Sequence, residues 1–176
     1  MHVLLLAGHR SDALSLADAW TRAAPHTTVE VHEVSLPAVP AAPGPGAAPS
    51  GGRGVLVAGA ALPVGRPTAE RSSAPSLTPS SLGRAEAAAL AERAAHADLV
   101  MVYVPVLDGP SLHRGPVVEA ALAASTSAVP VVVLAGRSEA SRREWSTAGL
   151  SGVHEVGDDP GARLVRVART WAPAWT

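Results

Sequence analysis

Four side chains of versatile chemistry lie close together in the sequence: Asp108, Ser111, His113 and Arg114. A carboxylate such as Asp108 can bind Mg²⁺ or accept a hydrogen bond from a substrate hydroxyl. Ser111 and His113 can donate to a phosphate, and Arg114 can hold an anion together with the backbone amides around Gly115. The segment therefore predicts a metal or anion site, although a surface turn capped by Asp108 also explains the letters D-G-P-S.

A second polar group follows the first apolar run of the chain. His9, Arg10, Ser11 and Asp12 stand where a first strand is expected to meet a first helix, which is a usual phosphate-binding position. Gly8 is the single glycine of this stretch, so neither a dinucleotide fingerprint nor a P-loop is present. The site interpretation stands here beside that of solvated loop residues.

Other candidates have simpler interpretations. Ser81, Gly83 and Glu86 surround an expected helix start, where capping accounts for them. The seven histidines show no metal-binding spacing, and His32, on an alternating strand, is expected to be exposed. No G-x-S-x-G elbow supports a hydrolase triad. Three tryptophans are expected to pack in the core or against a partner: Trp145, Trp171 and Trp175.

Composition excludes several classes of protein. The 176 residues carry a net charge of −1, so a basic nucleic-acid-binding surface is not expected. Cysteine is absent, which excludes disulfides and thiolate chemistry. All 14 basic residues are arginine, and asparagine is also missing. The longest apolar runs have the length of a strand, and the N-terminus does not read as a signal peptide, so we expect a cytoplasmic protein without membrane contact.

The elements expected to position these residues alternate between strand and helix. Apolar or alternating runs predict strands, and Ala/Leu-rich stretches predict helices. The run 54–61 fits either type. Two Pro/Gly-rich loops are expected at about 37–53 and 63–79, within a single domain of residues 1–176. Strands are expected at 3–7, 28–34, 99–106, 129–135 and 152–156, and helices at 13–24, 82–95, 117–124, 139–148 and 163–171.

This alternation predicts an α/β fold, a Rossmann-like three-layer sandwich with a mostly parallel sheet. Ligands of such sheets bind beyond the carboxyl ends of the strands, near the switch in strand order. We therefore expect Asp108 and the loop 8–12 to open into one cleft. The loops of interest are 8–12, 108–115, 136–138 and 157–159.

Three blocks of letters resemble a known family. They are A-D-L-V from Ala97, L-D-G-P-S-L-H-R-G-P from Leu107, and A-V-P-V-V-V-L-A-G ending at Gly136. Together they resemble the C-terminal part of bacterial glycerate kinases, and residues 3–19, 80–86 and 148–153 are more weakly similar. The resemblance implies phosphoryl transfer from ATP to glycerate with Mg²⁺. Asp108 would then be the catalytic residue holding metal or substrate, and Arg10 or Arg114 would steady phosphate.

The chain departs from that family where charge stabilisation is needed. No lysine is present, the N-D-G-G motif has no counterpart, and T-G-E-G-R is replaced by residues from Tyr103 to Val106. The chain thus resembles a short, diverged member. A second interpretation is a non-catalytic scaffold that binds a ligand, such as a small hydroxy acid or nucleotide, or makes subunit contacts, for example in a homodimer. A third is an unrelated small-anion or nucleotide binder of similar fold.

Overall fold

A computed structural model describes residues 1–34, 80–157 and 160–173. These residues belong to one of two units into which the chain divides, Met1–Pro37 with Leu77–Thr176. The other unit, Ala38–Ser76, lies outside the described residues, as do Trp175, the apolar run 54–61 and both expected Pro/Gly-rich loops.

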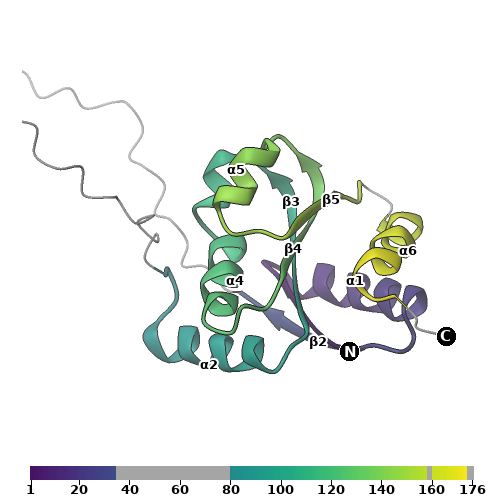
Figure 1. Cartoon of the computed structure of the whole chain (residues 1–176), viewed down its shortest axis with the longest axis horizontal. Helices are drawn as coiled ribbons and strands as arrows, with labels where there is room; N and C mark the ends of the chain where they lie inside the picture. Colours follow the sequence, from purple (N-terminus) through teal and green to yellow (C-terminus); the bar gives the residue numbers. More distant parts are fainter. Residues whose placement is uncertain (35–79, 158–159, 174–176) are drawn as a thin grey trace, which may run out of the picture. The chain divides into compact units, whose positions relative to one another are not determined.

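Five strands form one sheet in which every neighbouring pair is parallel (Figure 1). The strand order is β2-β1-β3-β4-β5. The chain therefore first moves outward from β1 to β2 and then crosses back over β1 to build the other half. The strands are β1 (His2–Ala7), β2 (Thr28–Glu33), β3 (Leu99–Leu107), β4 (Val131–Ser138) and β5 (Gly152–Glu155).

Helices cover both faces of this sheet, which confirms the expected three-layer α/β fold (Figure 1). One face packs against α1 (Arg10–Ala23) and α6 (Pro160–Trp171), and these two helices also contact each other. The other face packs mainly against α2 (Arg84–Ala95) and α4 (Pro116–Ser125). Two short helices complete this second layer: α3 (Gly109–Leu112) and α5 (Arg142–Thr147).

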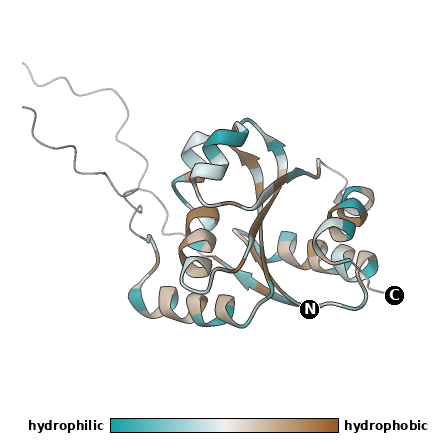
Figure 2. Cartoon of the chain, viewed as in Figure 1, coloured by the Kyte–Doolittle hydropathy of each residue, from teal (hydrophilic) through white to brown (hydrophobic). Residues whose placement is uncertain are grey.

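The central strands are apolar on both faces because both faces are covered. In β1, the residues from Val3 to Ala7 are all fully buried. Alternate side chains enter opposite clusters: Leu4 and Leu6 lie with α2 and α4, and Val3 and Leu5 lie with α1 and α6. Figure 2 shows the resulting hydrophobic sheet between the helices.

Several expected boundaries are corrected. The helix expected at 82–95 begins at Arg84, with Gly83 at its N-cap and no side-chain cap, so capping by Ser81 is wrong. Residues 136–138, expected as a loop, continue β4. The expected loop 108–115 contains the helix α3. The helix expected from residue 139 begins only at Arg142, because Ser141 forms a capping box with Glu144.

His32 was expected to be exposed and is instead half-buried. It lies on β2, and its face of the edge strand is near α2, since Arg93 and Glu86 of that helix act electrostatically on the ring. Burial is the main cause that lowers the pKa of His32, followed by the Arg93 charge. Its Nε2 atom is buried without a hydrogen-bond partner among the described residues.

The tryptophans that the structure describes pack as expected. Trp145 and Trp171 are partly buried against the two core clusters. Trp20 is fully buried and donates its indole N–H to the hydroxyl of Thr27 at 3.0 Å.

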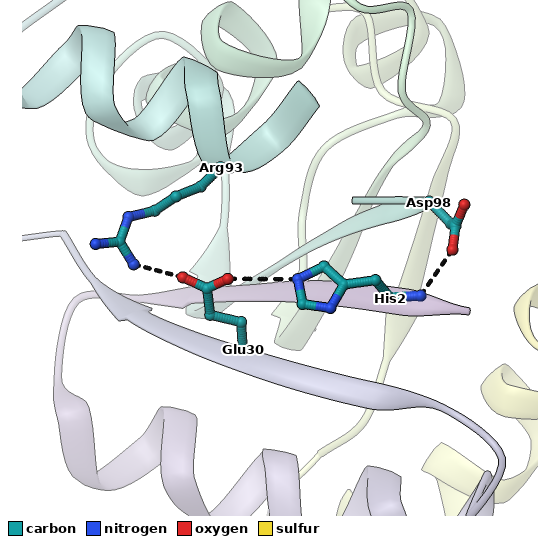
Figure 3. A network of polar contacts seen from close by, with 4 residues as sticks. All are labelled: His2, Glu30, Arg93 and Asp98. Carbon is teal, nitrogen blue, oxygen red and sulfur yellow. Dashed lines mark hydrogen bonds and ion pairs between the residues drawn. The ribbon is translucent and has the colours of Figure 1, made fainter. Parts of the chain in front are cut away.

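The amino ends of the central strands are joined by a polar network (Figure 3). The backbone N–H of His2 donates to Asp98 at 2.7 Å, and the His2 ring contacts Glu30 at 3.3 Å. Arg93 pairs with the other oxygen of Glu30. The network links β1, β2, α2 and the start of β3.

Within the described ranges, no helix combines the length and the apolar character that a membrane crossing requires. The cytoplasmic location expected from the sequence stays a prediction.

Candidate functional site

The strand order changes direction between β1 and β3, and an open cleft of about 830 Å³ lies at the carboxyl ends of the strands around this point. Ligands of open α/β sheets bind at this kind of switch point. The lining comes from α1, β3, β4, the end of β5 and α6. It consists of Asp12, Ser15, Leu16, Tyr103, Pro105, Gly136, Arg137, Glu155, Gly157 and Arg163.

Pro105 marks the place where the sheet opens. Val100 donates its N–H to the Pro130 carbonyl at 3.0 Å, so the even positions of β3 bond to β4 and the odd positions face β1. The last β1 pair is Ala7 with Tyr103. Pro105 therefore lies beyond the end of β1. A proline has no backbone N–H, and at this position the missing donor costs the sheet no hydrogen bond. The floor of the cleft is the gap left by the shorter strand.

Two glycines keep the cleft wall close to the backbone. A Cβ at Gly136 would stand 2.6 Å from the carbonyl oxygen of Pro105, so a larger residue would force β3 and β4 apart. Gly157 has φ of +61°, a left-handed conformation that favours glycine. The space above Gly157 holds the Arg163 guanidinium, whose carbon would lie 3.7 Å from a Cβ there.

Arg163 is oriented by the backbone that it covers. It donates one N–H to the carbonyl oxygen of Glu155 at 3.1 Å. The carboxylate of Glu155 accepts the backbone N–H of Ser138 at 2.8 Å, which holds it against the end of β4. Since a guanidinium carries five N–H donors, Arg163 retains donors for a bound anion.

The cleft carries charges of both signs. Arg137 and Arg163 are cationic, and Asp12 and Glu155 are carboxylates. Arg137 also reaches Glu139 at 2.6 Å in an exposed ion pair. Arginines suit phosphate or carboxylate groups, and carboxylates accept hydrogen bonds from hydroxyls. The apolar surfaces of Tyr103 and Pro105 complete a site for a ligand with anionic, hydroxyl and flat apolar parts.

The loop after β1 contributes to this cleft through one of its four candidate residues. Asp12 lies in the lining and accepts a hydrogen bond from the Ser11 hydroxyl at 3.4 Å. His9, Arg10 and Ser11 are exposed and lie outside the lining. His9 is the N-cap of α1 and makes no side-chain cap, so the first amides of the helix are not satisfied by it.

Asp108 lies outside the cleft lining and acts as a helix cap. Its carboxylate accepts the backbone N–H of Ser111 at 2.8 Å, and the Ser111 hydroxyl accepts the backbone N–H of Asp108 at 2.7 Å. Hydrogen bonds from the backbone and the side chain of Ser111 hold the pKa of Asp108 below its usual value, so the group is a weak base. The capping interpretation is confirmed. The expectation that Asp108 shares the cleft with Asp12 is not met by this lining.

The other candidates of this segment lead into α4. His113 is the C-cap of α3, and both His113 and Arg114 are exposed. Gly115 is the N-cap of α4 with φ of +77°, which explains the glycine at this position. Pro116 at the first helical position has no N–H, so α4 offers one amide fewer to an anion.

Metal binding by Asp108 stays a prediction. In residues 1–34, 80–157 and 160–173, no group of three His, Asp or Glu side chains has an arrangement that could hold a metal ion.

Glu119 is a buried carboxylate that the sequence did not single out. It is 2% exposed in the first turn of α4. It accepts hydrogen bonds from the Ser80 hydroxyl at 2.6 Å and from the backbone and hydroxyl of Ser81 at 2.6 and 2.7 Å. The two serines before α2 thus bind another helix instead of capping their own. The described residues give Glu119 a structural role.

Of the four loops expected at the ligand-binding edge, three supply lining residues: 8–12, 136–138 and 157–159. The lining side chains that the sequence did not predict include Tyr103, Pro105, Glu155 and Arg163. For Tyr103 and Pro105, the sequence did contain a signal, which is a proline late in a buried strand. Arg163 carried no signal, because its role depends on where α6 packs.

Comparisons of the chain with models of protein families, with curated proteins and with solved structures find no significant match.

Proposed function

We propose that the protein binds a small molecule in the switch-point cleft, and that this molecule carries an anionic group, hydroxyls and a flat apolar part. One observation carries the proposal: the cleft brings two arginines, two carboxylates and an aromatic ring together at the place where such folds bind ligands. Its volume of about 830 Å³ suits a cofactor-sized molecule.

The strand order suggests a first ligand to test. Flavodoxin-like sheets share the order β2-β1-β3-β4-β5 and bind flavin mononucleotide at the β1/β3 switch point. Only the fold supports this analogy. The residues present suit such a molecule: Arg163 for its phosphate, Asp12 for its hydroxyls, and Tyr103 for its ring. A bound flavin would supply hydride-transfer chemistry.

Phosphoryl transfer from ATP to glycerate, which the glycerate kinase resemblance implies, is the alternative. It requires Asp108 to leave its cap or to act from outside the described cleft lining. The geometry therefore favours the ligand-binding interpretation over the kinase.

The test is a titration of the purified full chain with flavin mononucleotide, and separately with ATP and Mg²⁺, followed by flavin fluorescence and thermal shift. We expect the flavin to bind. Arg163→Gln is expected to weaken binding about tenfold, because a charge-assisted bond to an anion is lost. Arg22→Gln, an exposed residue of α1 outside the lining, is the matched control.

Two outcomes contradict the proposal. In the first, neither flavin mononucleotide nor ATP binds. In the second, Arg163→Gln and Arg22→Gln bind flavin mononucleotide with equal affinity. ADP release with Mg²⁺-ATP and glycerate, abolished by Asp108→Ala, would establish the kinase instead.

A further inference from the structure

A second cavity, of about 370 Å³, lies beside β5 and α6. It shares two residues with the switch-point cleft, Glu155 and Arg163, so the two spaces are neighbours. The described residues that line it are Val153, His154, Glu155, Arg163, Arg166 and Val167.

The positive charge of this cavity comes from α6. Arg163 and Arg166 are three residues apart, so they lie on the same side of the helix. Within the part of the chain that the structure describes, neither guanidinium lies within ion-pair distance of a carboxylate. Arg163 makes one bond, to the backbone oxygen of Glu155 at 3.1 Å. Two guanidinium groups therefore line one cavity, and contacts with the described residues use only a small part of their donors.

Glu155, the carboxylate among the described lining residues, is held from another side. Glu155 accepts the N–H of Ser138 at 2.8 Å, at the end of β4. Among the described lining residues, two arginines therefore stand against one carboxylate that already has a donor.

His154 helps to fix α6. The indole N–H of Trp171 donates to His154 Nε2 at 2.8 Å. An indole can only donate, so the proton of the neutral imidazole resides on Nδ1. The Trp171 ring also occupies the space above Gly152, where a Cβ would stand 2.8 Å from it. These contacts hold α6, and with it both arginines, against β5.

We propose that this cavity binds a phosphate group between Arg163 and Arg166, as the second phosphate of a pyrophosphate whose first phosphate lies in the switch-point cleft. Because a single guanidinium lines both spaces, the two anionic groups must be neighbours, as they are in pyrophosphate. The ligand class is then a nucleoside diphosphate or a pyrophosphate-linked dinucleotide. The placement of the first phosphate in the switch-point cleft rests on the proposed function.

Calorimetric titration with ADP and with AMP tests the assignment. We expect the wild-type chain to bind ADP about tenfold more tightly than AMP, because the second phosphate gains charge-assisted bonds. Arg166→Gln is expected to remove this preference. Arg169→Gln, an exposed residue of the same helix outside both linings, is expected to keep it. Circular dichroism checks that both variants are folded.

Inorganic pyrophosphate separates the two proposals. Suppose that pyrophosphate binds and that Arg166→Gln abolishes this binding, while FMN and AMP do not bind and ADP binds no more tightly than pyrophosphate. The proposed function of the cleft then fails, and the phosphate site at Arg166 stands. If FMN binds but ADP has no advantage over AMP, the cleft proposal stands and the second phosphate site is overturned. Equal ADP-to-AMP ratios in Arg166→Gln and Arg169→Gln also overturn the site.

Discussion

The two edges of the sheet use similar side chains for different purposes. At the amino edge, Glu30 contacts both His2 and Arg93, and Asp98 accepts a backbone N–H at 2.7 Å (Figure 3). At the carboxyl edge, the one hydrogen bond of Arg163 to the described residues goes to a backbone oxygen. The Glu30 charge is therefore met by other side chains of the fold, whereas the Arg163 charge is placed beside the cleft by a backbone contact.

The shape of a parallel sheet explains this difference. β1 ends at Ala7 while β3 continues to Leu107, so the carboxyl edge has a gap that no strand fills. Connections leave the switch point in opposite directions and keep that gap open. At the amino edge, His2 begins β1, Asp98 directly precedes β3, and the two residues bond directly. The contrast predicts that changes at the carboxyl edge affect both binding and stability, and that changes at the amino edge affect stability alone.

The largest effect is expected at the carboxyl edge from Gly136→Ala. The new Cβ would clash with the Pro105 carbonyl at 2.6 Å, so β3 and β4 must shift at the cleft floor. We expect a loss of about 3 kcal/mol in the free energy of unfolding, together with weaker FMN binding. Urea denaturation and flavin fluorescence measure the two effects. Gly109→Ala is the control, since nothing lies within 4 Å of its Cβ position. A stable, fully binding Gly136→Ala protein would refute the tight β3–β4 approach.

Glu119→Ala tests whether a closed polar cluster outside the cleft behaves like the amino edge. The change removes an acceptor of three hydrogen bonds from Ser80 and Ser81. We expect a loss of about 2 kcal/mol in stability, without a change in FMN affinity for the folded protein. Denaturant midpoints and flavin titration below the unfolding transition provide the measurement. Altered FMN affinity would show that Glu119 acts on the cleft.

Acidification is expected to weaken the fold through His154 and His32. Burial lowers the pKa of both rings, so the unfolded chain binds protons more readily than the folded one. Their contribution to stability is complete above the unfolded value of about 6.5 and is lost as the pH falls through it toward the lower folded values. Urea midpoints at about pH 7.5 and about pH 5.5 measure the loss. His154→Gln, which keeps an acceptor for Trp171, should reduce it. An unchanged pH profile in this variant would remove His154 as a cause.

The smallest effect is expected at the amino edge from Glu30→Gln. Its partners His2 and Arg93 are partly exposed, and exposed ion pairs contribute little. We expect a loss of about 0.5 kcal/mol, reduced further at high salt, with unchanged FMN affinity. Denaturation in low and high salt checks the first point. A binding defect in this variant would contradict the separation between the two edges.

Much of the fold could be predicted from local patterns. Continuous apolar runs identified the buried strands, because a strand covered on both faces needs apolar side chains at every position. The predicted starts of the helices were less accurate. Ser81 has the sequence features of a cap, yet it bonds to Glu119, a residue 38 positions away. That competition depends on how α2 and α4 pack.

The candidate site was only partly predictable. The expectation that ligands bind at the carboxyl edge led to Asp12, Gly136 and Gly157, which line the cleft. Asp108 and Ser111 drew attention as a polar cluster, but they satisfy each other in a capping box. Reactive residue types close together in sequence bond to each other as readily as to a ligand, since hydrogen-bond donors and acceptors need partners in either case.

By itself, the sequence determined the layers of this protein, the parallel sheet and the edge at which polar loops gather, because hydrophobic periodicity is set locally. Tertiary structure alone decided that Arg163 stands over Gly157 and that Tyr103 shares a cleft with Asp12. These residues lie far apart in the chain and meet only because β1 stops short and α6 packs beside α1. The physical reason is that a ligand site depends on distances between elements, and no local pattern encodes those distances.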